Sequence, residues 1–103
     1  MIKVSVMYPK TAESTFDLAY YRDTHMALVR DRLGDACKRT AIEFGLAGGA
    51  PGEGPTYIAM GHMYFESVAD FQTAFGPHAK EILGDIPNFT NVQPTVQISD
   101  VIE

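Results

Sequence analysis

The sequence predicts an α+β domain with the element order strand, helix, strand, strand, helix, strand. Three observations predict it: an alternating apolar pattern at the start of the chain, two segments of helical periodicity, and a Gly- and Pro-rich loop between two central strands. With 103 residues the chain has room for one compact domain, so residues 1–103 are interpreted as a single unit.

The composition excludes several classes of protein. Hydrophobic residues make up 46% of the chain and charged residues 20%, which is typical of a globular protein. The formal net charge is −5 and the basic residues are scattered, a surface that phosphate backbones repel. The single Cys37 has no partner for an internal disulfide, and no apolar run approaches the length of a membrane span. We therefore expect a cytoplasmic protein that binds neither nucleic acid nor membrane.

The first strand is expected over Ile2–Tyr8, where apolar residues alternate with other side chains. A helix is expected over Thr15–Leu33, with Ser14 or Thr15 as its cap and Gly34 closing it. Helical spacing places five of its residues on one apolar stripe: Leu18, Tyr21, His25, Leu28 and Val29. His25 thus lies on the side of the helix that otherwise carries hydrophobic residues. This makes the helix a candidate for the functional site.

Two central strands follow the helix. Lys38–Leu46 and Thr56–Glu66 alternate in the manner of strands, and the second is largely apolar on both faces. Between them, Gly48–Pro55 supports neither a helix nor a strand, and we interpret it as a long hairpin loop. A phosphate-binding loop is the alternative, but no lysine or helix start accompanies it.

The C-terminal part predicts a second helical region and a last strand. Ser67 begins a helix whose expected buried stripe contains Val68, Phe71 and Phe75. Gly76 and Pro77 interrupt it, and a short second helix is expected to run as far as Leu83. The last strand is expected over Val92–Ile102, at an edge or bulge because of Pro94.

This order is that of the ferredoxin-like fold, in which a four-stranded antiparallel sheet carries both helices on one face. The other face carries more apolar side chains than water tolerates. A symmetric homodimer that packs sheet on sheet would cover it.

Several segments resemble the EthD family, in the subgroup of EthD-family reductases. They span essentially the whole chain: VMYPK, FDLAYYRDTHMALV, GLAGGAPG, FGPHAKEI and DIPNFTNVQPTVQIS. The resemblance implies a ferredoxin-like protomer, a homodimeric α+β barrel and a small pocket between sheet and helices. Related dimeric barrels include cofactor-free monooxygenases, lactone isomerases, polyketide cyclases and haem enzymes. The fold alone therefore does not determine which reaction is catalysed.

The candidate catalytic residues are His25 and Tyr21. A partly desolvated histidine can take or give a proton near neutral pH. The alternative is a core histidine satisfied by a backbone carbonyl or by a tyrosine such as Tyr64; the match to the helix histidine of the family favours a pocket role. Tyr21 lies one turn earlier on the same face, where a phenol can stabilise an enolate or phenolate.

The other candidates are expected to bind substrate. They are two tyrosines, two histidines, a phenylalanine and a carboxylate: Tyr8, Tyr64, His62, His78, Phe75 and Asp85. Asp85 could orient His25, whereas turn formation is its simpler explanation. The three histidines lie on separate elements without metal-ligand spacing, and no Gly-rich turn joins a strand to a helix. We therefore expect no metal and no tightly bound cofactor.

The resulting hypothesis is a small EthD-type oxidoreductase, either a cofactor-independent monooxygenase or an enolising isomerase. His25 would act as general base on a small apolar or aromatic metabolite. One alternative is a non-catalytic protein that binds such a metabolite or assists a catabolic oxidation pathway. Another is a dimeric assembly unit in which His25 is purely structural.

Overall fold

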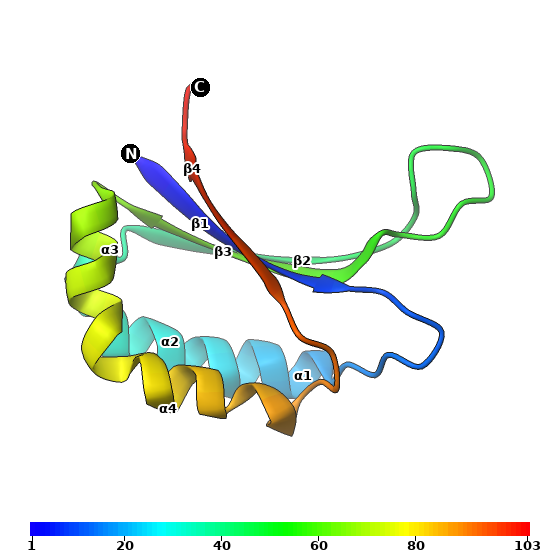
Figure 1. The fold of residues 1–103 in the computed structure, drawn as a ribbon, viewed down its shortest axis with the longest axis horizontal. Helices are drawn as coiled ribbons and strands as arrows, with labels where there is room; N and C mark the ends of the chain where they lie inside the picture. The colour runs from blue at the N-terminus through cyan, green and yellow to red at the C-terminus, as the bar shows by residue number, and fades with distance from the viewer.

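Four strands form one antiparallel sheet, and every helix lies on the same side of it (Figure 1). The computed structural model describes residues 1–103. The strands and helices, in chain order, are β1 Ile2–Pro9, α1 Leu18–Tyr20, α2 Met26–Leu33, β2 Arg39–Phe44, β3 Tyr57–Phe65, α3 Val68–Phe75, α4 Ala79–Gly84 and β4 Thr95–Asp100. The sheet order is β2-β3-β1-β4, with each neighbouring pair antiparallel. This confirms the predicted ferredoxin-like α+β fold.

The first helical segment is continuous from Leu18 to Leu33 because a widened turn, Tyr21–His25, joins α1 to α2. Its predicted cap was wrong. Asp17 caps the helix, and its carboxylate accepts a hydrogen bond from the Tyr20 backbone N–H at 3.0 Å. Ser14 instead exchanges hydrogen bonds with the backbone of Thr11 in the preceding turn. Gly34 ends the helix with φ 58°, the positive φ expected there.

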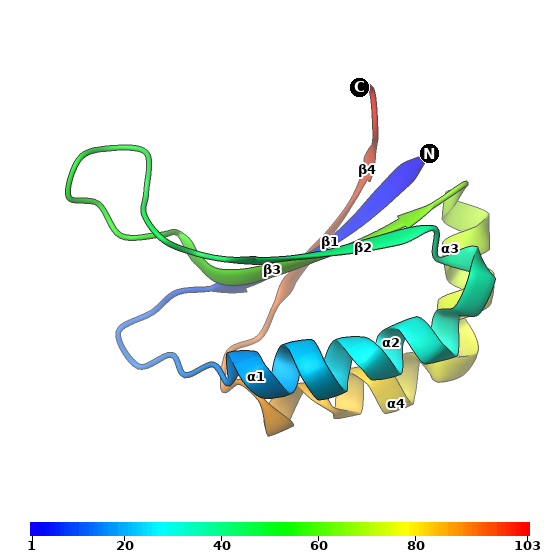
Figure 2. The same cartoon turned by 180° about the vertical axis from the view of Figure 1, so that it is seen from behind.

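The second helical segment begins as predicted, with the Ser67 hydroxyl accepting a hydrogen bond from the Asp70 N–H at 3.0 Å. A tight turn at Gly76–His78 separates α3 from α4. The predicted burial of Val68 was wrong, because this side chain is 39% exposed. The helix α3 stands at one end of the sheet (Figure 2), and its Phe71 and Phe75 pack on the core whereas Val68, its first residue, does not.

The last three strands are shorter than expected, whereas β1 extends one residue further. The hairpin between β2 and β3 is antiparallel, and its loop projects beyond the sheet (Figure 1). The edge strand β4 begins directly after Pro94 and not at Val92 as expected, because proline has no N–H to donate to a strand ladder. None of the helices has the length and apolar character needed to cross a bilayer.

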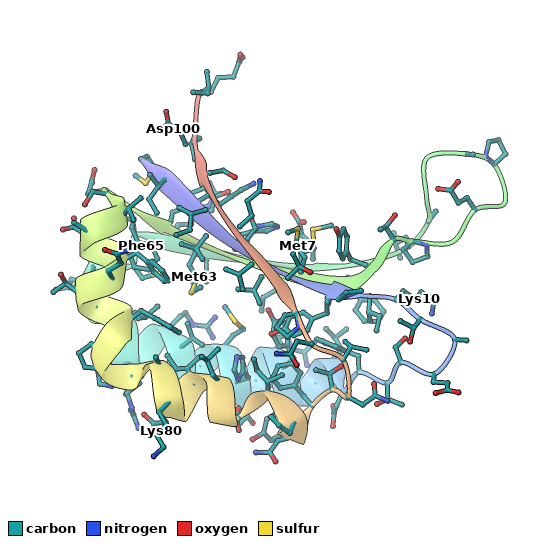
Figure 3. The ribbon with its side chains drawn as sticks, in the orientation of Figure 1. Met7, Lys10, Met63, Phe65, Lys80 and Asp100 are labelled. Atoms are coloured by element: carbon teal, nitrogen blue, oxygen red, sulfur yellow. The ribbon has the colours of Figure 1, made fainter.

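The core lies between the sheet and the helices. The pairing of β1 with β3 sets Val4 opposite Met63 and Val6 opposite Gly61, so these residues share the helix-covered face. Figure 3 shows Met63 pointing from β3 toward the helices, while Met7 on β1 belongs to the other face. Twelve buried side chains form the core, among them Tyr8, Tyr21 and Phe65 at 1% exposure or less.

No helix covers the opposite face of the sheet, which we call the open face (Figures 1 and 2). It is more polar than predicted, because a hydrogen-bonded row crosses three strands there. The Ser5 hydroxyl lies 2.8 Å from His62 Nδ1, and His62 Nε2 lies 3.0 Å from a Glu43 carboxylate oxygen. Met60 belongs to the same face and supplies apolar surface.

Candidate active site

A cavity of about 200 Å³ lies between the sheet and the helices. Thirteen of its sixteen lining residues are hydrophobic, so a charged ligand would lose its hydration there without gaining a charged partner. An engineered apolar cavity of about 150 Å³ takes up benzene. The volume therefore suits a molecule with one ring and a small substituent.

The helix turn Tyr21–His25 brings His25 to this cavity. The backbone N–H of Met26 bonds to the carbonyl of Tyr21, which is the wide spacing of a π-turn, a feature frequent at functional sites. The rings of Tyr21 and His25 stack with centroids 5.6 Å apart, and Phe89 packs on the imidazole at 4.6 Å. His25 is 4% exposed and packs against both aromatic rings, which also contact each other.

One side of the imidazole is anchored to a carboxylate. His25 Nδ1 lies 2.9 Å from Asp85 Oδ2, and Asp85 Oδ1 accepts hydrogen bonds from the Tyr20 hydroxyl at 2.7 Å and the Asn88 amide at 2.9 Å. A carboxylate held by three donors has little freedom to turn. Asp85 therefore fixes both the position and the orientation of the His25 ring.

The pKa shifts of the pair determine where the protons lie. Burial lowers the pKa of His25, and the Asp85 carboxylate only partly opposes this, so His25 is neutral at pH 7. Burial on its own would raise the pKa of Asp85, but the hydrogen bonds from Tyr20, Asn88 and His25 bring it below its usual value. Because an ionised carboxylate only accepts hydrogen bonds, the imidazole proton sits on Nδ1. Nε2 then carries a free lone pair.

That lone pair has no hydrogen-bond donor within the protein. No fully buried side-chain nitrogen or oxygen lacks a partner, so the unpartnered Nε2 of His25 keeps access to the cavity that the residue lines. The same holds for the phenol oxygens of Tyr8 and Tyr21, which also make no hydrogen bond with the protein. Three polar atoms thus remain available in an apolar cavity.

Both phenols stay protonated. Burial raises the pKa of Tyr21 far above its usual value, and burial together with the neighbouring Tyr21 ring does the same to Tyr8. Each hydroxyl can therefore donate a hydrogen bond to a ligand oxygen at any physiological pH. A base nitrogen and two neutral donors make an arrangement suited to removing a proton and stabilising the oxyanion that results.

Gly61 makes room for this arrangement. A Cβ placed on Gly61 would collide with the Tyr21 hydroxyl oxygen. The absence of a side chain at this position of β3 therefore lets the Tyr21 hydroxyl approach the strand closely.

The structure brings only part of the predicted site together. Tyr8, Tyr21, His25 and Phe75 line the cavity, and the suggested contact between Asp85 and His25 is confirmed. His62 and Tyr64 do not reach the cavity, because their positions in β3 alternate with those of Met63 and direct them to the open face.

His78 does not line the cavity either. It lies in the tight turn between α3 and α4 and is half-buried there. The same turn orients the following α4, whose Ile82 does line the cavity.

The sequence reading missed Tyr20 and Asn88 as the groups that hold Asp85. Asn88 lies three residues after Asp85 in one turn, which is a visible local signal, but Tyr20 is 65 residues away and nothing in the sequence pairs it with Asp85. No cluster of three or more His, Cys, Asp or Glu side chains has the arrangement of a metal site.

Comparisons with known proteins identify the family. The EthD domain matches residues 9–93. An EthD-like protein from Ralstonia eutropha JMP134 is 48% identical, with a TM-score of 0.95 over 99% of this chain and 92% of that chain. No curated protein matches the sequence.

Two more distant solved structures share the fold. An ethyl tert-butyl ether (EthD) family protein from Bacillus halodurans C-125 is 20% identical, with a TM-score of 0.75 over 99% of each chain. A candidate monooxygenase from Shewanella loihica PV-4 is 17% identical, with a TM-score of 0.62 over 99% of this chain and 94% of that chain. Since the domain match covers most of the sequence and the Ralstonia eutropha relative is nearly half identical, the chain belongs to the EthD family.

Proposed function

We propose that this protein is an enzyme that removes a proton from a small apolar carbonyl or phenolic substrate, with His25 as the general base. The observation that supports this most directly is the free Nε2 of a neutral imidazole, held by Asp85 at its other nitrogen and open to an apolar cavity. A base with a pKa below that of free histidine is present in its active form at neutral pH.

The proposed step moves one proton and one electron pair. His25 Nε2 takes the proton from a carbon next to a carbonyl, or from a phenol O–H. The C–H or O–H electron pair moves into the substrate and leaves negative charge on its oxygen. The hydroxyls of Tyr21 and Tyr8 donate hydrogen bonds to that oxygen, and the dry surroundings strengthen those bonds.

Two outcomes are open to the resulting anion. Return of the proton to a different carbon gives an isomerisation. Donation of the electron pair to dioxygen, as a co-substrate, gives an oxygenation; the Shewanella loihica relative, described as a candidate monooxygenase, shares the fold on which this second outcome would occur. Both outcomes begin with the same proton transfer, which is the part the geometry supports.

The test measures proton exchange in place of product formation. Acetophenone is incubated in D₂O with the protein, and loss of its α-proton signals is followed by NMR. His25→Asn should reduce the exchange rate by about 10²-fold or more, because a positioned general base contributes about that much. His78→Asn is the matched control, since His78 does not line the cavity. Equal exchange in His25→Asn and the native protein, with both folded, would exclude this function.

A further inference from the structure

The cavity opens onto a surface groove, which we call the α4–β4 groove. Four residues line both: Leu83, Ile86, Pro94 and Val96. The groove has a volume of about 510 Å³, more than twice that of the cavity. The two spaces therefore lie next to each other and share these four residues as lining.

The shared residues include the exposed ones. Leu83 is 51% exposed and Val96 is 54% exposed, although both also line the buried cavity. Leu83 belongs to α4 and Val96 to β4, so the cavity reaches the surface between these two elements. Large aliphatic side chains left half in water at a cavity mouth gain by burial when an apolar group occupies the groove.

The groove has no charged residue among those that line it. Its polar groups are mostly committed within the protein. The Asn91 side chain bonds to the Thr15 N–H and the Glu13 carbonyl, and the Thr90 hydroxyl donates to the Thr15 carbonyl. An anionic or strongly polar ligand would find almost no free partner here.

We infer that the substrate carries an alkyl chain, and that the chain leaves the cavity through the Leu83–Val96 mouth and lies in the α4–β4 groove. This deepens the proposed function and rests on it, because the ring and its oxygen are the part placed at His25. The cavity holds about one ring, so a chain on the far side of the ring from the oxygen must leave the cavity, and the half-exposed Leu83 and Val96 offer it an apolar way out. The substrate class is then a phenol or aryl ketone with an alkyl chain opposite the oxygen.

Binding measurements on a homologous series test the chain. The probes are 4-ethyl-, 4-butyl- and 4-hexylphenol, and their affinities are measured by calorimetry. In the native protein the affinity should rise about fourfold for each added methylene, the increment expected for burial of that group. Affinity that is flat or falling beyond 4-ethylphenol would overturn the inference, whether because the cavity is closed or because a second copy of the chain fills the groove.

Two variants locate the chain, and a third is the matched control. Leu83→Asn and Val96→Thr should each reduce the gain in affinity from 4-ethylphenol to 4-hexylphenol severalfold; because both residues also line the cavity, the readout is this gain and not the affinity for the ring itself. Ile98→Thr lies two residues further along β4, is also exposed and lines neither space, so it should behave as the native protein. Equal dependence on chain length in all three variants would contradict the assignment.

The inference and the proposed function fail separately. Binding needs no proton transfer, so His25→Asn should retain the increase of affinity with chain length while losing exchange of the acetophenone protons. A normal chain-length dependence with no exchange in the native protein would contradict the function alone. Proton exchange in the native protein without any dependence of affinity on chain length would contradict only the proposal that an alkyl chain lies in the α4–β4 groove.

Discussion

His25 and Asp85 form a hydrogen-bonded pair, 2.9 Å between Nδ1 and Oδ2, that joins the widened helical turn to the turn after α4. Tyr20 and Asn88 complete the set of donors around the carboxylate. The pair leaves a single reactive atom, His25 Nε2, on the cavity side. His25 therefore has one nitrogen bound to Asp85 and one nitrogen free to act on a ligand, and the first two predictions depend on this difference.

The pH dependence of exchange should show an acid limb below the pKa of free histidine, about 6.5. Burial lowers the pKa of His25, so the imidazole remains an active base until the pH falls through that lowered value. Activity should then be lost as His25 is protonated. The measurement is the exchange rate as a function of pH; a limb above the free-histidine value would show that the ring is not desolvated.

Asp85→Asn should move the acid limb to lower pH and slow exchange. The carboxylate partly offsets the effect of burial on the His25 pKa, and its loss removes that support. Loss of the obligatory acceptor also frees the ring to place its proton on Nε2, so the rate should fall by about one order of magnitude or more. Asp70→Asn, at the exposed start of α3, is the control. An unchanged limb in Asp85→Asn would show that the pair does not tune the base.

Gly61→Ala should destabilise the protein and displace Tyr21. The new methyl group would collide with the Tyr21 hydroxyl oxygen, and overpacking of this kind costs about 1–3 kcal/mol. Adding Tyr21→Phe removes that oxygen, and the next ring atom, Cζ, lies 3.4 Å from the Cβ position, which is an ordinary contact. The double variant should therefore recover most of the lost stability.

The matched control for this pair is Gly84→Ala. A Cβ at Gly84 meets nothing within 4 Å, and alanine in a helix is favoured over glycine by about 1 kcal/mol. Thermal unfolding of five proteins measures the coupling: the native protein, Gly61→Ala, Tyr21→Phe, the double variant and Gly84→Ala. If Tyr21→Phe failed to rescue Gly61→Ala, the close approach between these two residues would not be the cause of the loss.

We propose that the open face forms the contact of a homodimer. It is the one face of the sheet that no helix covers (Figure 2), and Met7 and Met60 on the two central strands supply apolar surface there. Met60→Glu should shift the protein from dimer to monomer in native mass spectrometry, because an unpaired carboxylate would be buried in the contact. Ala69→Glu, on the exposed side of α3, should leave the dimer intact. A native protein that is monomeric would contradict this proposal.

The fold could be predicted from the sequence because local signals and topology agree. The strand alternation at Ile2–Tyr8, the cap at Ser67 and the positive φ at Gly34 each depend on neighbours within a few residues. Errors arose where a choice between adjacent candidates was needed, as with Asp17 and Ser14. Both residue types cap helices, and only the backbone geometry decides between them.

The candidate site was predictable only in part. Periodicity placed Tyr21 and His25 on one face, and the structure stacks their rings. The hydrogen bond from the Tyr20 hydroxyl to the Asp85 carboxylate was not predictable, because it depends on how two turns far apart in the sequence pack against each other. His62 and Tyr64 were expected to bind substrate, and the structure places them on the side of β3 away from the cavity; an apolar pattern on both sides of β3 does not tell which side the helices cover.

The most direct test of the account is ¹⁵N NMR of the labelled His25 imidazole, with and without 4-ethylphenol. At pH 7 we predict a neutral ring with its proton on Nδ1, and a change in the Nε2 signal when the phenol binds. A charged ring, a proton on Nε2, or an Nε2 signal that stays constant at saturating phenol would contradict the assignment of His25 as the base.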